Sequence, residues 1–179
     1  MVVTTIVVVR SPKIQESIAL LRGLSAVRQF TEKPLPEEAV SDILDVIRWS
    51  GNAHNRQEFQ VLWIENRETL ERLSNLKGYA KHLAQARVGA VIVTWLESDE
   101  LNAFDEGRVA ERIMLAALAH GISSSIGWLF DEARDQAKLI LDVPSDRTVR
   151  TTVSLGFAAE SADRGRRRKP LGELVKRLD

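Results

Sequence analysis

The chain has 179 residues, in which 25 basic side chains balance 25 acidic ones, and it contains no cysteine. This length suits a single domain over residues 1–179 that buries a real core. The zero net charge argues against broad attraction to nucleic acid or to a membrane surface. The lack of cysteine excludes disulfides and thiolate metal sites.

Residues 1–10 predict an N-terminal strand or extended arm, because the run from Val2 to Val9 is rich in β-branched residues. This start is not typical of a signal peptide, since no basic residue precedes the apolar run and no small-residue cleavage site follows it. No apolar run approaches the roughly 20 residues that a membrane helix needs. We therefore expect a cytoplasmic protein that has no membrane partner.

The first third of the chain predicts two helices. Ser11 and Pro12 favour the start of a helix that ends at Gly23. A second helix is expected to open at Pro36, with acidic residues near its positive end, and to stop at the loop that begins with Ser50. The apolar stripe of the second helix is predicted to consist of Val40, Ile43, Leu44 and Ile47.

The rest of the chain predicts strands and helices in uneven alternation. Residues 59–64 favour a strand, residues 67–76 a short helix, and residues 88–96 an apolar strand that is covered on both faces. A largely buried helix is expected over residues 108–120. The remaining elements are an apolar, serine-containing segment over 122–129, a helix over 131–141, a strand over 148–157 and a helix over 171–178. This order favours an α+β layer architecture over a series of βαβ units.

Residues 49–59 form a loop of small and amide-bearing residues between a predicted helix and a predicted strand. Such a loop exposes backbone N–H groups and carboxamides, which are the donors and acceptors that a polar heterocycle requires. Taken alone, the pattern is weak, because Ser, Gly and Asn also mark ordinary turns.

Two basic segments lie at opposite ends of the chain: Arg28, and the run over residues 164–169. Guanidinium groups bind phosphate through paired hydrogen bonds and keep their charge at any working pH. Only the tail is dense in charge, and no aromatic residues are interleaved with it. A local phosphate contact is therefore favoured over nucleic-acid binding.

Other catalytic patterns are missing from the sequence. The three histidines have no metal-binding spacing, so we expect no metal. Ser123-Ser124-Ser125 lacks the Gly-x-Ser-x-Gly arrangement of a nucleophile elbow, and no glycine-rich phosphate loop exists. We expect no catalytic side chain, because a redox cofactor that carries its own chemistry would account for this inventory.

Several motifs resemble those of the nitroreductase family of flavoproteins. Val27-Arg28-Gln29-Phe30, followed by Lys33-Pro34-Leu35-Pro36, resembles its N-terminal signature, and Asn55-x-Gln57 resembles its Pro-Ser-x-x-Asn-x-Gln loop. Further matches are Asp105-x-Gly107 with Leu115-Ala116-Ala117, the segment 121–128, Val143-Pro144, Leu155-Gly156-Phe157 and Arg166-x-Arg168-x-Pro170-Leu171. The matches are collinear from residue 24 to residue 175, so they cover nearly the whole chain.

The resemblance implies an α+β fold with a central mixed or antiparallel sheet flanked by helices. It also implies a homodimer that forms through long helices and binds one FMN per subunit at its interface. Arg28, Arg166 and Arg168 would contact the FMN phosphate or ring edge, and the loop residues Gly51, Asn52, Ala53 and Asn55 would contact the isoalloxazine, often from the partner subunit. Backbone groups of Ser125, Ile126 and Gly127 would approach the reactive ring nitrogen.

The chain departs from the family pattern at two places. Leu24-Ser25-Ala26 stands where the family has Arg-Arg-Ser or a close variant, so that Ser25 is only a partial substitute. Gly51-Asn52 replaces the family's Pro-Ser, and glycine raises the entropy cost of ordering the loop. We expect FMN to be held more weakly or differently than in the family.

The activity implied by the resemblance is hydride transfer from NADH or NADPH through FMN to an electron-poor acceptor by a ping-pong mechanism. The acceptor would be a nitroaromatic, a quinone or an enone. Trp128 and Phe130 could stack on a flat acceptor, although a role in the core is the favoured interpretation for each. Two alternatives stay open: a different flavin reaction, such as dehalogenation, dehydrogenation or flavin fragmentation, and a flavin-binding or interaction protein without turnover.

Overall fold

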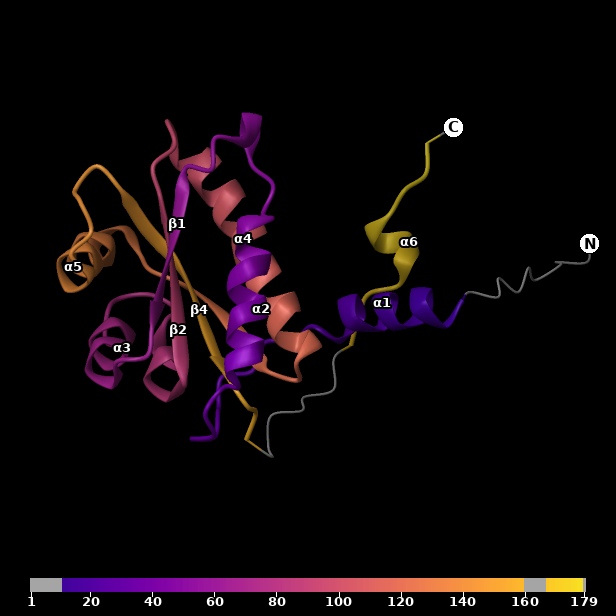
Figure 1. Ribbon diagram of the computed structural model, residues 1–179. Helices are drawn as coiled ribbons and strands as arrows, with labels where there is room; N and C mark the ends of the chain where they lie inside the picture. The colour runs from indigo at the N-terminus through magenta and orange to yellow at the C-terminus, as the bar shows by residue number, and fades with distance from the viewer. Residues whose placement is uncertain (1–10, 160–166, 179) are drawn as a thin grey trace, which may run out of the picture.

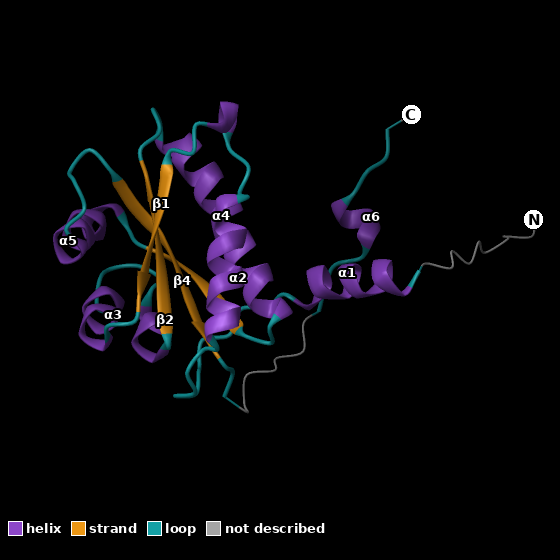
Figure 2. Cartoon of the chain, in the orientation of Figure 1, coloured by secondary structure: helices purple, strands orange, loops and turns teal. Residues whose placement is uncertain are grey.

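The centre of the molecule is a four-stranded antiparallel sheet (Figure 2). This computed structural model describes residues 11–159 and 167–178, so the arm expected over residues 1–10 lies outside the described residues. The strands are β1 (Phe59–Ile64), β2 (Val88–Thr94), β3 (Ser123–Trp128) and β4 (Thr148–Gly156), in the spatial order β1-β2-β4-β3. Because β2 and β4 are central, β3 forms one edge of the sheet.

Helices cover both faces of the sheet (Figure 1). On one face, α2 (Glu37–Arg48) and α4 (Asp99–Ala119) pack against side chains such as Ala90 and Ile92 of β2. On the other face, α3 (Arg67–Ser74) and α5 (Asp131–Leu141) pack with Val91 and Val93. Alternate side chains of β2 therefore pack into two separate hydrophobic cores, one on each face of the sheet, as expected for a strand that is buried on both faces.

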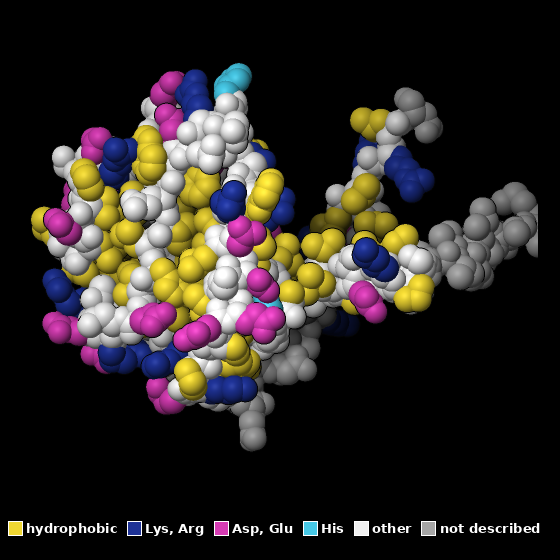
Figure 3. All heavy atoms as spheres, in the orientation of Figure 1, with side chains coloured by type: hydrophobic (Ala, Val, Ile, Leu, Met, Phe, Trp, Pro, Cys, Tyr) yellow, Lys and Arg dark blue, Asp and Glu magenta, His cyan; other side chains and the backbone are white. Residues whose placement is uncertain are grey.

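Two helices extend away from this body (Figure 1). No side chain of α1 (Pro12–Gly23) or of the short α6 (Leu171–Leu174) is buried. Apolar side chains lie open on both helices (Figure 3), among them Leu21, which is 57% exposed, and Leu171, which is 73% exposed. Within the described residues, no helix combines the length and the apolar character needed to cross a membrane.

The expected start of the long helix at residue 108 is wrong by nine residues. The α4 helix begins at Asp99, where Ser98 Oγ accepts a hydrogen bond from the Leu101 amide at 3.3 Å. Asp105-Glu106-Gly107 consequently lies inside the helix rather than before it. The first two turns lack an apolar stripe because they bury polar side chains, namely those of Asn102, Asp105 and Glu106. A reading based on apolar periodicity cannot recognise such turns.

Two smaller expectations are also corrected. The helix predicted over residues 171–178 spans only Leu171–Leu174, because no side chain in it is buried and a short helix without packing is marginal. In α2, Leu44 is 43% exposed, and the buried stripe consists of Ala39, Ile43 and Ile47.

A β-bulge interrupts the pairing of β2 with β4. Ile92 pairs with Thr151, but Val93 pairs with Val149, so Arg150 is an extra residue without a partner on β2. A bulge redirects the side chains around it. Arg150 and Thr151 are adjacent in sequence, yet both side chains bond to Glu106 of α4.

Candidate functional site

The edge strand β3 is covered at both ends and open in the middle. The Val27 amide donates to the Ser124 carbonyl at 2.8 Å, and the Tyr79 amide donates to the Trp128 carbonyl at 2.7 Å. Bonded and non-bonded pairs alternate along an antiparallel ladder. Since the Leu129 amide bonds inward to the Arg150 carbonyl, the N–H and C=O of Ile126 point out of the sheet edge. This backbone edge is available to a ligand.

A cavity of about 630 Å³ opens beside this stretch of β3. Its volume lies within the range of roughly 300–1,000 Å³ that is usual for small-molecule sites. The cavity is lined by Arg28, Gly78, Tyr79, Lys81, His82, Ile126, Gly127 and Trp128. These residues come from three separate segments of the chain, which meet because the residues before β2 and those before α2 both run along the β3 edge.

The lining of the cavity is cationic. Arg28 and Lys81 are both exposed, and among the described residues no acidic side chain lines the cavity. His82 is the third basic side chain in the described lining. Its pKa is lowered to about 4, chiefly by burial and also by the nearby Arg28 charge, against a smaller opposing effect of the Tyr79 and Ile126 backbone. His82 is therefore neutral at pH 7. The two remaining cations favour an anionic ligand.

His82 belongs to a buried chain of hydrogen bonds beneath the cavity. Its Nδ1 atom lies 2.8 Å from Ser154 Oγ, and that hydroxyl lies 3.3 Å from the Ser125 carbonyl. The other ring nitrogen, His82 Nε2, is buried and has no hydrogen-bond partner among the described residues.

Gly127 is required where the strand passes over this histidine. A Cβ atom at residue 127 would lie 2.5 Å from Thr152 Oγ1, 2.8 Å from His82 Nε2 and 3.0 Å from the Tyr79 carbonyl oxygen. These separations are shorter than van der Waals contact. The close approach of β3 to the His82 ring therefore depends on the absence of a side chain at Gly127.

The amide-rich loop adopts one defined and strained conformation. The Asn52 side chain accepts from the Gln57 amide at 2.8 Å and donates to the Ser50 carbonyl at 3.2 Å. Three residues in the loop that are not glycine have positive φ: His54 at 53°, Asn55 at 54° and Gln57 at 56°. Such conformations cost free energy and concentrate at functional sites.

This loop does not line the cavity at the β3 edge within the same chain. Gly51 instead lies under the Arg108 guanidinium, and Asn52 lines a hollow of about 360 Å³ together with Phe104 and Arg108. Asn55 is exposed. The structure therefore divides the predicted site residues between two regions of one chain.

The other predicted residues are placed as follows. Arg28, Ile126 and Gly127 come together in the cavity, whereas Ser125 is buried beneath it and Ser25 lies half-buried beside β3. Arg168 is exposed just before α6, Ala53 lies in a 3-10 turn, and Arg166 lies outside the described residues. Sequence reasoning did not identify Gly78, Tyr79, Lys81 or His82 as cavity residues. The sequence did contain one signal: Lys81 and His82 are adjacent, and they lie shortly before the apolar strand that begins at Val88.

Comparisons with known proteins agree with this fold. Residues 22–86 match the model of the nitroreductase family. The curated "Putative NADH dehydrogenase/NAD(P)H nitroreductase" of Archaeoglobus fulgidus is 22% identical over 164 residues, which cover 83% of this chain and 89% of that protein.

Two solved structures illustrate the likeness in three dimensions. The FMN-dependent nitroreductase of Clostridium difficile R20291 superposes with a TM-score of 0.81 at 20% identity, covering 90% of this chain and 99% of that one. NfrA2 of B. megaterium also has a TM-score of 0.81, at 18% identity, covering 92% of this chain and 74% of that one. The resemblance to the nitroreductase family is thus confirmed, and the chain has the nitroreductase fold.

Proposed function

We propose that this protein is an FMN-dependent oxidoreductase that passes hydride from NADH or NADPH to an electron-poor acceptor such as a nitroaromatic, a quinone or an enone. The observation that carries the proposal is the open backbone edge at Ile126 beside a cavity with two cations, Arg28 and Lys81. The names of the relatives, which refer to NAD(P)H and to FMN, support the same reaction class.

The described residues fit FMN. A phosphate needs cations, and Arg28 and Lys81 supply them at the cavity. A polar ring edge needs paired donors and acceptors, and the backbone of Ile126 offers both. Gly127, which has no side chain, lets β3 lie close over His82 at this cavity. The proposed contacts also include Ser25, Ser125, Arg166 and Arg168.

FMN, when bound, supplies the hydride-accepting and hydride-donating chemistry, so the protein need only bind, orient and tune it. Arg28 and Lys81 would hold the phosphate and fix the position of the ring along β3. The Ile126 amide would donate to negative charge at the ring edge, a type of interaction that accelerates reactions in water-poor sites. No described side chain is needed as an obligatory acid or base, because solvent can supply protons to the reduced acceptor. Donor and acceptor would use the same cavity in turn, which is a ping-pong cycle.

We further propose that the protein acts as a homodimer. The exposed apolar side chains of α1 and α6, such as Leu21 and Leu174, would be covered by a second copy. The exposed Trp49 begins the amide-rich loop, and the exposed Phe104 lines the same hollow as Asn52; both would be covered in the same way. In such an assembly Asn55 and its neighbours would reach the cavity of the partner subunit, which would complete the divided site. The cytoplasmic location stays a prediction from the sequence.

Two measurements test the proposal. The visible absorption spectrum of the purified full-length protein, before and after addition of FMN, shows whether flavin binds. Consumption of NADH and of NADPH, with and without menadione, shows whether turnover occurs. We expect flavin absorbance and menadione-dependent consumption. A colourless protein that takes up no FMN would overturn the proposal, and flavin binding without turnover would favour the non-catalytic alternative.

A further inference from the structure

A fully buried ion pair lies next to the cavity, between α4 and β4. Glu106 has no exposed surface and Arg150 is 3% exposed. Arg150 Nε donates to Glu106 Oε2 at 3.0 Å, and Arg150 Nη2 donates to Oε1 at 3.2 Å. Thr94 and Thr151 donate their hydroxyls to the same carboxylate at 3.0 and 2.6 Å. Each oxygen of the Glu106 carboxylate therefore accepts two hydrogen bonds.

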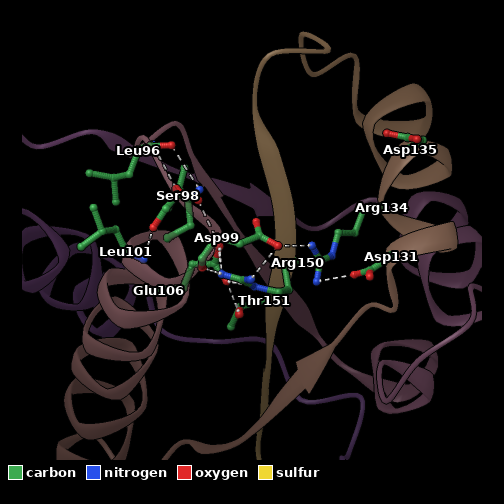
Figure 4. Close-up of polar contacts among 12 residues, drawn as sticks. Leu96, Ser98, Asp99, Leu101, Glu106, Asp131, Arg134, Asp135, Arg150 and Thr151 are labelled. Atoms are coloured by element: carbon green, nitrogen blue, oxygen red, sulfur yellow. Dashed lines mark hydrogen bonds and ion pairs between the residues drawn. The ribbon is translucent and has the colours of Figure 1, made fainter.

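Arg150 is also held from its far side. Its Nη2 atom donates to the Asp99 carbonyl at 3.2 Å, and its Nη1 atom lies 3.8 Å from the Asp99 carboxylate. Figure 4 shows the guanidinium between Glu106 and Asp99, and Arg134 bonded in turn to Asp99 and Asp131. The side chain reaches this place because Arg150 is the extra residue of the β-bulge. The Arg150 guanidinium is thus fixed in position.

Burying two charges costs more desolvation free energy than it commonly returns in stability. A buried pair that is bonded on every side is therefore weak evidence for a role in stability alone. One further contact of Arg150 indicates what the pair does. Its guanidinium carbon lies 4.8 Å from the centre of the Trp128 ring. Trp128 is 40% exposed and lines the cavity at the β3 edge.

We propose that the Glu106–Arg150 pair is a positioning device for Trp128, whose indole forms an aromatic wall that selects flat, ring-shaped acceptors. This inference rests on the proposed oxidoreductase function. A cation over one face of an indole restrains the ring. The other face is then presented to the cavity at a fixed angle, where planar acceptors stack and compact non-aromatic ones gain nothing. Glu106, Thr94 and Thr151 act only through Arg150, so they are positioning residues.

The chain contains a matched control for this contact. Arg147 lies over the ring of Trp95 at 4.2 Å, and neither residue lines the cavity. The variant Arg147→Met therefore removes a cation from a tryptophan face without touching Trp128. The corresponding test variant is Arg150→Met combined with Glu106→Gln, which removes both buried charges and leaves neither unpaired. Trp128→Leu removes the wall itself, and Trp128→Phe keeps an aromatic ring.

The first readout is the near-ultraviolet circular dichroism of full-length protein. Trp128 is one of four tryptophans. Its contribution in each protein is obtained by subtracting the spectrum of the same protein with Trp128→Phe added. We expect this contribution to fall by more than about half in the double variant, since a freely rotating indole gives little signal, and to persist in Arg147→Met. An unchanged Trp128 signal in the folded double variant would overturn the positioning role.

The second readout is the steady-state kinetics of the FMN-loaded protein with menadione, a flat quinone, and with methyl vinyl ketone, a compact enone. We expect the KM for menadione to rise about tenfold in Trp128→Leu and in the double variant, with kcat changed by less than about twofold. Trp128→Phe should restore most of the lost affinity, and the KM for the enone should stay unchanged. Equal effects on both acceptors would overturn the selecting role. A failure to bind FMN would count against the proposed function, whereas the dichroism would still decide the positioning role.

Discussion

Gly127→Ala is the most direct test of how β3 is seated over His82. The new methyl group would lie 2.5 Å from Thr152 Oγ1, 2.8 Å from His82 Nε2 and 3.0 Å from the Tyr79 carbonyl oxygen. The Tyr79 backbone cannot retreat easily, because its amide donates to the Trp128 carbonyl at 2.7 Å. We therefore expect β3 to shift at its edge. Overpacking of this kind costs about 1–3 kcal/mol in the free energy of unfolding.

The assay is thermal unfolding of the full-length protein. A loss of about 2 kcal/mol lowers the melting temperature by roughly 4–8 °C in a protein of this size. The control is Gly107→Ala: residue 107 lies inside α4, and a Cβ there meets nothing within 4 Å. That variant should gain about 0.5–1 kcal/mol, because alanine is the better helix former. If Gly127→Ala melted at or above the wild-type temperature, the close approach of β3 to His82 would be refuted.

Three further predictions concern charge. The folded state holds His82 neutral by lowering its pKa from 6.5 to about 4, so the unfolded chain binds more protons in that interval. The free energy of unfolding should therefore fall as the pH drops from 6.5 toward 4. In the His82→Gln variant, the midpoint of urea unfolding should depend less on pH in this interval. Arg150→Met alone should cost about 3–5 kcal/mol, because it leaves Glu106 buried without its cation, and its combination with Glu106→Gln should recover most of the loss in urea unfolding. Lys81→Ala should weaken FMN binding by about tenfold but barely affect riboflavin, which lacks the phosphate; equal losses for both ligands in fluorescence titrations would contradict the phosphate contact.

Much of the fold could be predicted from the sequence where one periodicity governs a segment. The strand Phe59–Ile64 and the helix Asp131–Leu141 have the bounds that their patterns predict. The prediction was wrong at the start of α4, where buried polar residues replace the apolar stripe. Glu106 is such a residue: its burial depends on Arg150, which is 44 positions away in the sequence. Local patterns carry no information about a partner at that separation.

The candidate site was predictable only in part, for a similar reason. Arg28, Ile126 and Gly127 were expected from motifs, and the fold brings them into one cavity. Lys81 and His82 reach the same cavity because the segment before β2 pairs with the end of β3, through the Tyr79 amide and the Trp128 carbonyl. A contact between segments so far apart in the sequence leaves no local pattern. The expected contacts of Asn55 stay a prediction. In one chain that residue is exposed and does not line the cavity, so its role depends on a second copy.

The β-bulge at Arg150 makes the length of β4 as important as its composition. Val149 and Thr151 pair with neighbouring residues of β2, so the bulge absorbs one surplus residue. Removing that residue would restore a regular ladder, but it would delete the cation of the buried pair. Adding a second residue next to Arg150 would turn the preceding side chains of β4 to the opposite face of the sheet, including that of the buried Val149. Insertions and deletions should therefore be excluded from this short stretch, whereas substitutions that preserve its residue count can be accommodated.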